Sequence, residues 1–195
     1  MAPLNANRSS GSGYRTVIEW VVILMAVLLC TVVLRTYVVQ SFSIPSLSMA
    51  PTLQVGDRII VNKLSYRVHE VHRGDIVVFA RPPLEMQNYT DLVKRVIGLP
   101  GETISSRNGK VYINGKLLAE PWLPPGPQSY TGALTDGNQQ YNLPGPAKIP
   151  AGEYYVMGDN RTDSEDSRFF GPIPKSLIVG RAIAVVWPLS QAKGV

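Results

Sequence analysis

One stretch of this chain combines four serines and two prolines with large apolar residues, and from residue 41 to residue 53 it reads Ser41-Phe42-Ser43-Ile44-Pro45-Ser46-Leu47-Ser48-Met49-Ala50-Pro51-Thr52-Leu53. Pro45 and Pro51 fix their own φ angles and push the residue before each of them towards an extended conformation. The stretch is therefore predicted to be an ordered turn and not a helix. Hydroxyl groups held on such a turn beside apolar side chains suit a serine nucleophile and its pocket. A serine- and proline-rich linker has the same composition, so both interpretations stay open at this point.

The segment before this stretch is strongly apolar and carries no charge from Trp20 to Leu34. Extended to residues 17–39, it is long enough at ~1.5 Å per residue to cross a hydrocarbon core of roughly 30 Å. Glu19 and Arg35 would then lie near the two interfaces. We predict a transmembrane helix over residues 17–39, preceded by a disordered tail over residues 1–16.

A cleaved signal peptide is the alternative for this segment. No A-x-A-like cleavage site ends the apolar run, so an uncleaved anchor is favoured. Arg8 and Arg15 precede the predicted helix and outweigh Arg35 at its far end. Because positive charge is retained on the cytoplasmic side, the tail is expected in the cytoplasm and residues 40–195 on the outer side of the membrane.

Short runs rich in β-branched residues, bounded by glycine or charged residues, follow the anchor and are typical of strands. An Asn-Gly pair at residues 114–115, between two apolar runs, predicts a hairpin. The fold class expected for residues 40–195 is therefore mainly β, an antiparallel sheet domain, with an irregular Pro/Gly-rich excursion at about 120–150. The predicted strands lie in Arg58–Leu64, Asp75–Phe79, Asp91–Ile97, Lys110–Ile113, Glu153–Met157 and a buried closing strand, Val179–Trp187.

Composition excludes several classes of function. The net charge of +5 includes no run of five basic residues, so no nucleic-acid partner is predicted. The single cysteine, Cys30, lies in the apolar segment, so residues 40–195 can form no disulfide. Two histidines are too few for a transition-metal site, and Arg161 occupies a ligand position that a calcium loop would need. No cofactor and no metal are expected, although a site made only of carboxylates and water is not excluded by these counts.

Lys94 is the candidate base that remains once histidine is set aside. A Ser-His-Asp triad would need His69 or His72 beside the nucleophile, and both lie in a polar turn. On a strand, Leu92, Lys94 and Val96 share one face, which places the lysine in apolar surroundings. The alternative is an edge-strand lysine whose ammonium reaches solvent, as most lysines do.

Four segments, taken in order, resemble the sequence blocks of type I signal peptidases, the membrane-bound serine proteases that remove signal peptides from exported proteins. They correspond to the family's nucleophile block, the strand before its lysine, the lysine block and a final polar block. The ordered set is highly specific. The segments are Ile44–Leu53, Arg73–Phe79, Val93–Gly101 and Gly158–Arg168.

The resemblance implies that Ser48 is the nucleophile, Lys94 the general base and Ser164 the serine that positions this lysine. It also implies an oxyanion hole made by the backbone N–H of Ser48 and the hydroxyl of Ser46. A neutral lysine accepts the serine proton readily if its pKa falls from ~10.4 to about 8 or below. Burial against apolar neighbours such as Leu92 lowers the pKa of an amine.

The resemblance further implies the substrate and its setting. An extended substrate would add as a strand along the site, with small residues at positions −1 and −3 in shallow pockets. The implied partners are preproteins that carry signal peptides with A-x-A-like sites, the lipid bilayer and, by association, the secretion machinery. The implied location is the plasma or thylakoid membrane. The pocket residues are Phe42, Ile44, Met49, Leu53 and Val93.

The chain departs from the family pattern at two places. Leu47 stands where glycine is common in bacterial members, and Thr162-Asp163 replaces the more usual Asp-Asn. One anchor is expected, where some bacterial members have two. Neither departure removes a catalytic group. A structural network of acidic and basic side chains is expected from Asp159, Arg161, Asp166 and Arg168.

Two rival functions fit parts of the sequence. A self-cleaving repressor-type protease shares the serine–lysine chemistry, but such proteins are soluble, and the apolar segment argues against this class. An anchored β domain that binds extended peptides is the non-enzyme alternative. It would show an ordinary titration of Lys94 and precursor binding without cleavage.

Overall fold

The structure is a computed structural model that describes residues 11–82, 90–107, 110–123 and 146–195. The chain divides into two compact units, residues 1–39 and residues 40–195, and each is described by itself. Most of the predicted tail, and residues 124–145 of the predicted Pro/Gly-rich excursion, lie outside the described residues.

The first unit contains one long helix, α1 (Gly11–Tyr37). Its segment Gly13–Arg35 has a mean hydropathy of 2.8 and is long and apolar enough to cross a membrane. Helix α1 begins before the predicted start at Val17, because no helix-breaking proline lies between Gly11 and Tyr37. Arg35 lies in the last turn, where a positive charge complements the helix dipole.

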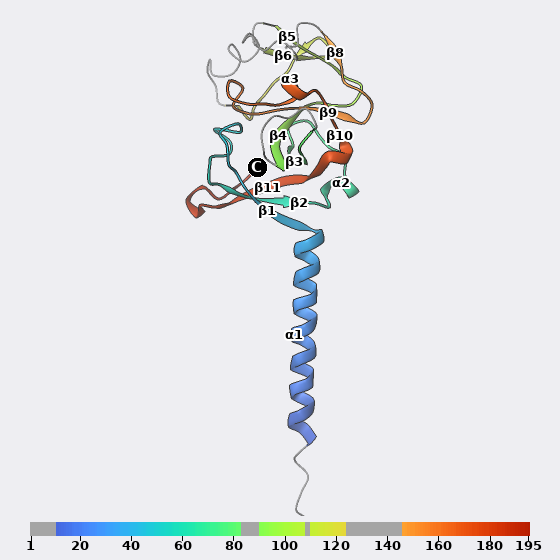
Figure 1. Cartoon of the computed structure of the whole chain (residues 1–195), viewed down its shortest axis with the longest axis vertical. Coiled ribbons are helices and arrows are strands. Elements are labelled where there is room, and N and C mark those ends of the chain that lie inside the picture. Colours follow the sequence, from blue (N-terminus) through green and yellow to red (C-terminus); the bar gives the residue numbers. More distant parts are fainter. Residues whose placement is uncertain (1–10, 83–89, 108–109, 124–145) are drawn as a thin grey trace, which may run out of the picture. The chain divides into compact units, whose positions relative to one another are not determined.

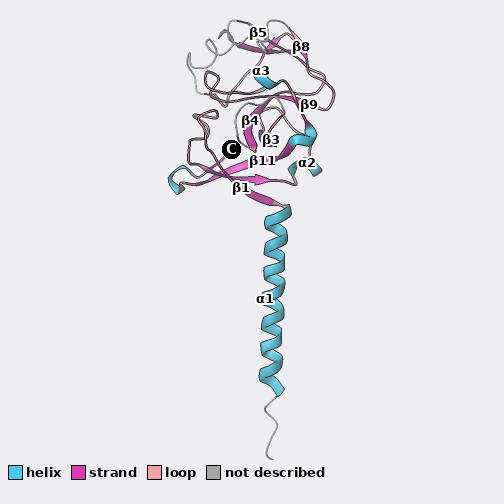
Figure 2. Ribbon diagram, viewed as in Figure 1, coloured by secondary structure: helices cyan, strands magenta, loops and turns pink. Residues whose placement is uncertain are grey.

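The second unit contains an eight-stranded sheet, in which the order along the main path is β1-β2-β11-β3-β4-β9-β10, with β12 paired to β11. The described pairs from β2 to β10 are antiparallel, which confirms the predicted mainly β, antiparallel class. Figures 1 and 2 show these strands and the short helices beside them. The bounds are β1 Val39–Ser43, β2 Arg58–Asn62, β3 Ile76–Ala80, β4 Asp91–Gly98, β9 Glu153–Met157, β10 Ile173–Pro174, β11 Ile178–Trp187, β12 Lys193–Gly194, α2 Ser65–Val68, α3 Ser167–Phe170, η2 Lys175–Leu177 and η3 Leu189–Gln191.

A second sheet of four strands has the order β7-β6-β5-β8. Its hairpin turn contains Asn114 at φ 50° and Gly115 at φ 76°. Two successive residues with positive φ are what a two-residue hairpin turn requires, so the predicted Asn-Gly hairpin is confirmed. Strand β5 was not predicted, because it is short and mostly polar. The bounds are β5 Thr103–Arg107, β6 Lys110–Ile113, β7 Lys116–Leu117 and β8 Ala147–Lys148.

Buried side chains from the larger sheet anchor the serine-rich stretch. Ile44, Met49 and Leu53 belong to one hydrophobic cluster with Ile59 and Val61 of β2. These apolar side chains enter the core on both sides of Ser48, so the core fixes the turn that carries its hydroxyl.

Strand β11 differs from its prediction as a buried strand. Its backbone pairs with β2 and β3, but Ile183 is 41% exposed and Trp187 is 55% exposed. Backbone pairing on both sides does not require that both faces of a strand be covered, because alternate side chains point to opposite faces. The prediction took an apolar run to mean two buried faces, and that was wrong.

Candidate active site

Ser48 lies on a turn closed by backbone hydrogen bonds. The N–H of Ala50 donates to the carbonyl of Leu47 at 2.9 Å, and the N–H of Leu53 donates to the carbonyl of Met49 at 2.9 Å. The Ser48 side chain is nearly buried, with 8% of the residue exposed. The prediction of an ordered turn is therefore confirmed, and the interpretation of this stretch as a linker is wrong.

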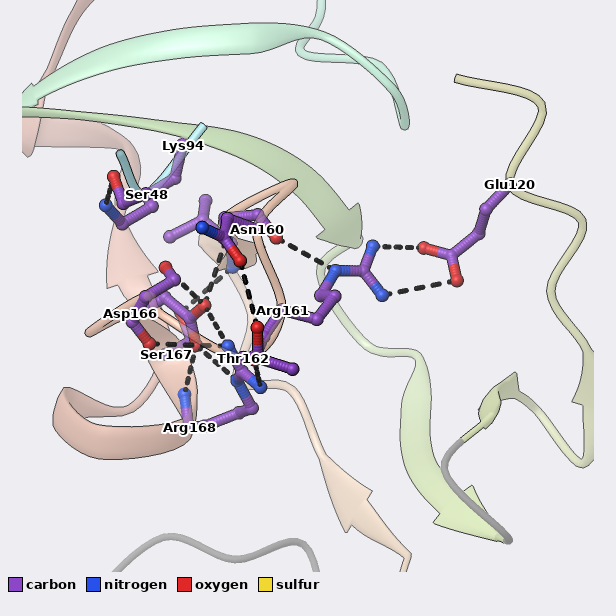
Figure 3. Close-up of polar contacts among 12 residues, drawn as sticks. Ser48, Lys94, Glu120, Asn160, Arg161, Thr162, Asp166, Ser167 and Arg168 are labelled. Carbon is purple, nitrogen blue, oxygen red and sulfur yellow. Dashed lines mark hydrogen bonds and ion pairs between the residues drawn. The ribbon is translucent and has the colours of Figure 1, made fainter. Parts of the chain in front are cut away.

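Lys94 reaches the serine from β4. Its Nζ lies 2.8 Å from Oγ of Ser48, within hydrogen-bond distance, and Figure 3 shows this contact as a dashed line. The residue is 3% exposed, so this lysine does not extend into solvent. Its neighbours on the same face, Leu92 and Val96, are buried as predicted. A serine and a lysine that are 46 residues apart in sequence thus form one buried pair.

Ser46 completes the immediate surroundings of the nucleophile. Its Oγ lies 3.2 Å from Oγ of Ser48. In the described part of the chain, the backbone N–H of Ser48 has no hydrogen-bond acceptor. The Ser46 hydroxyl thus donates to Oγ of Ser48, and the Ser48 N–H lies beside it.

Asp166 is a fully buried acid that organises the segment behind this site. It accepts hydrogen bonds from Ser164 Oγ at 2.9 Å and from the N–H of Gly158 at 2.9 Å, and it pairs with Arg168 at 2.7 Å. Burial alone would raise the pKa of the Asp166 carboxyl, but the Arg168 guanidinium and the Gly158 N–H hold this pKa below its usual value. The expected ionic network is thereby confirmed at Asp166 and Arg168.

Gly158 lets this segment approach Ser48 closely. A Cβ at this position would clash with Oγ of Ser164 and with the carbonyl oxygen of Ser48. Only glycine allows both groups to approach so closely. Ser164 therefore packs near the Ser48 backbone, while the hydrogen bond described for its hydroxyl goes to Asp166. Its predicted role in positioning Lys94 stays a prediction.

Comparison with known proteins adds evidence to this geometry. A profile of the family described as "Signal peptidase, peptidase S26" matches residues 17–187. The chain belongs to the signal peptidase family, peptidase S26. This confirms the family predicted from the four segments, and it makes the protein a peptidase by family.

Individual signal peptidases are similar over most of the chain. "Signal peptidase I V" of Bacillus subtilis is 45% identical over 69% of this chain and 77% of its own length. "Signal peptidase IB" of Staphylococcus aureus is 34% identical over 92% of this chain and 94% of its own. "Probable signal peptidase I-2" of Synechocystis sp. is 41% identical over 74% of this chain, but the match spans only 61% of that relative.

The candidate site of this signal peptidase opens into a cavity of about 190 Å³. Four of the five predicted pocket residues line it: Phe42, Ile44, Met49 and Val93. Leu53 does not line it; its side chain is fully buried in the hydrophobic cluster. Thr90 and the first half of β4, Asp91–Lys94, also line the cavity.

Sequence reasoning missed one buried acid near this site. Glu120 pairs with both terminal nitrogens of Arg161, as the two dashed lines in Figure 3 show. Nε of Arg161 donates to the carbonyl of Gly158 at 2.9 Å. The two side chains of this ion pair are only 2% and 3% exposed. Glu120 fell in the predicted irregular excursion, and no local sequence signal marks it as buried.

Metal ligands do not gather at this site. Within the described residues, no group of three or more histidine, cysteine, aspartate or glutamate side chains is arranged to hold a metal ion. The buried acids Asp159 and Asp166 are both paired with arginines.

Proposed function

We propose that this signal peptidase is a membrane-anchored serine endopeptidase that removes signal peptides from exported preproteins, with Ser48 as nucleophile and Lys94 as general base. The observation that carries the proposal is the 2.8 Å contact between Nζ of Lys94 and Oγ of Ser48 in a buried site. A serine hydroxyl needs a positioned proton acceptor to attack a peptide bond, and a neutral amine is such an acceptor.

The reaction follows from these positions. The Ser48 proton passes to Nζ of Lys94 as Oγ bonds to the scissile carbonyl carbon, and the carbonyl electron pair moves onto oxygen. The Ser48 N–H and the Ser46 hydroxyl stabilise that oxyanion. Collapse of the intermediate expels the amine, which takes the proton from Lys94 and leaves an acyl-enzyme. Water, deprotonated by Lys94, then hydrolyses the ester and restores Ser48.

Burial makes Lys94 suitable for this role. At 3% exposure, little water is available to solvate an ammonium group, so the neutral amine is favoured. Asp166 interacts with Lys94 by charge, and its pairing with Arg168 offsets part of its negative charge. We propose that Ser164, on the same segment, helps to orient the amine.

The size of the cavity supports a preference for small side chains. About 190 Å³, walled by Phe42, Ile44, Met49 and Val93, accommodates small groups better than aromatic ones. In the described residues, β9 pairs with β4 only from Arg95 onward, so the edge of residues 91–94 is open to an extended peptide. Such a peptide would add as a strand and present alternate residues to the pocket, as cleavage after A-x-A requires.

The apolar helix supports an anchored enzyme. We propose that α1 crosses the membrane once, with its positively charged start in the cytoplasm and residues 40–195 on the outer side of a plasma or thylakoid membrane. In this orientation the site would lie on the side of the membrane where exported preproteins emerge, and we propose that the enzyme associates functionally with the secretion machinery.

The test uses the full chain in detergent with a precursor that carries an A-x-A site. The wild type should cut after the second alanine, as mapped by mass spectrometry of both products. Ser48→Ala and Lys94→Ala should remove cleavage while circular dichroism stays unchanged. Full cleavage by a well-folded Lys94→Ala variant would rule out the serine–lysine mechanism, and precursor binding without any cleavage by the wild type would identify a peptide-binding module instead.

A further inference from the structure

We infer that Asn160 and Thr162 are positioning residues for the oxyanion hole, acting through the peptide unit between Leu47 and Ser48. The inference rests on the proposed function, because that peptide unit carries the Ser48 N–H that would face the oxyanion. No part of it depends on the identity of the substrate.

The peptide unit in question has two polar ends. Its N–H belongs to Ser48 and its carbonyl to Leu47, and because a peptide bond is planar, fixing the carbonyl fixes the N–H. The Leu47 carbonyl accepts a hydrogen bond from Nδ2 of Asn160 at 3.2 Å as well as the turn bond from the N–H of Ala50 at 2.9 Å. Two donors from separate segments of the chain therefore hold this carbonyl and, with it, the orientation of the peptide plane.

Asn160 also holds the next peptide unit. Its backbone N–H donates to the carbonyl of Ser48 at 3.1 Å. One residue, 113 positions away from Leu47 in the sequence, thus holds the carbonyls on both sides of the nucleophile. The Ser48 N–H has no acceptor within the described chain. The two hydrogen bonds from Asn160 therefore leave this N–H available to donate to the oxyanion. A hydrogen bond to the carbonyl of a peptide unit also polarises it and strengthens its N–H as a donor.

Thr162 fixes which end of the Asn160 amide faces the nucleophile. Its Oγ1 lies 3.1 Å from Oδ1 of Asn160, a contact that Figure 3 shows as a dashed line. Since the Leu47 carbonyl only accepts, Nδ2 must face it, and the threonine hydroxyl must donate to Oδ1. A carboxylate at position 162 has no proton to donate and would oppose Oδ1. Thr162 belongs to one of the two departures from the family pattern. Its role in this inference is to orient the Asn160 amide.

The experiment compares steady-state and single-turnover cleavage of an A-x-A precursor by the full chain in detergent. Asn160→Asp keeps the side-chain volume but removes the donor to Leu47, and it should lower kcat about 10²-fold while KM stays within about twofold. Asn160→Ala should lower kcat in the same direction. Thr162→Val removes the hydroxyl at constant shape and should lower kcat about fivefold. Thr162→Ser keeps the hydroxyl and should therefore retain the wild-type kcat.

Two readouts separate positioning from a general structural role. The acidic limb of the pH profile of kcat/KM should keep its midpoint in Asn160→Ala, Thr162→Val and Thr162→Ser, because these variants add no charge near Lys94. Asp163→Asn is the matched control, since it exchanges the same two residue types on the same loop, with an exposed side chain. It should retain wild-type kcat and the same pH midpoint.

Three results would overturn the inference: an Asn160→Asp variant with at least half of the wild-type kcat, a loss that appears in KM instead of kcat, or a Thr162→Asp variant as active as the wild type. A wild type that cleaves nothing would contradict the proposed function itself. A wild type that cleaves, together with active Asn160 variants, would contradict only the assignment of positioning residues.

Discussion

The two faces of strand β4 carry two adjacent basic residues in different chemical settings. Lys94 is 3% exposed, and its Nζ contacts a serine hydroxyl at 2.8 Å. Arg95 is 6% exposed, and its guanidinium holds both oxygens of Asp159 at 2.8 and 2.7 Å while it stacks on Trp122. A carboxylate partner keeps a buried cation charged, whereas a hydroxyl partner suits a neutral amine. One strand therefore carries a structural charge next to the lysine that we propose as the proton acceptor.

The strongest test of this comparison removes the lysine amine. Lys94→Met preserves a long unbranched side chain, and we expect cleavage to fall by about 10⁴-fold, because Lys94 is the only base that contacts the Ser48 hydroxyl among the residues that the structure describes. The free energy of unfolding should change by no more than about 1 kcal/mol, since Ser48 keeps Ser46 as a hydrogen-bond partner. Precursor cleavage and urea unfolding of the same samples measure the two quantities.

The matched change on the other face is Arg95→Met. It leaves Asp159 buried with Thr52 as its remaining described partner, at 2.5 Å. We expect the free energy of unfolding to fall by about 3–5 kcal/mol, because an uncompensated buried charge is costly. Urea unfolding followed by tryptophan fluorescence tests this. A stable but inactive Arg95→Met variant would contradict the comparison. It would show that Arg95 serves catalysis and not stability.

Glu120→Gln probes a second buried pair, farther from the nucleophile. The glutamine keeps one oxygen as an acceptor for Arg161 but loses the charge, so we expect a loss of about 1.5–3 kcal/mol in the free energy of unfolding. Because Arg161 also supports the Gly158 carbonyl, cleavage should weaken as well. Glu165→Gln, a change of the same kind outside this pair, serves as the control. Equal stability of the two variants would contradict a structural role for Glu120.

Acid should act on the enzyme through Asp166. Its pKa is lower in the folded protein than in the unfolded chain, so the unfolded chain binds the proton first as the pH falls. The resulting stability is present above about pH 4 and is lost as the pH falls through the lower, folded value. Urea unfolding at a series of pH values should show this decline, and Asp166→Asn should flatten it. A wild-type profile without any acid limb would contradict the assignment.

The sequence alone was sufficient for the residues whose signals are local. The period-two pattern around Lys94 predicted its buried face, the two prolines predicted the turn at Ser48, and Asn114-Gly115 predicted its hairpin. Contacts between distant segments could not be found in this way. Glu120 meets Arg161 across 41 residues, and Asn160 meets Leu47 across 113, so neither pairing leaves a local pattern.

The errors have physical causes as well. Leu53 is apolar and follows Ser48 closely, but its side chain is fully buried in the core and does not line the pocket. Trp187 ends an apolar run, yet its side of β11 is not covered. Sequence reports the chemistry of a side chain, while the direction in which it points depends on how the strands are arranged.

The open edge of β4 limits what the proposed enzyme can cut. In a chain already folded into helices or sheets, the backbone N–H and C=O groups are hydrogen-bonded within the fold. They cannot also form hydrogen bonds with this edge. Only a segment that is extended and unstructured at that moment can complete the ladder beside residues 91–94. Because cleavage would require pairing with this edge of β4, mature, folded proteins at the membrane surface would not be cut. This selectivity would not depend on their sequences.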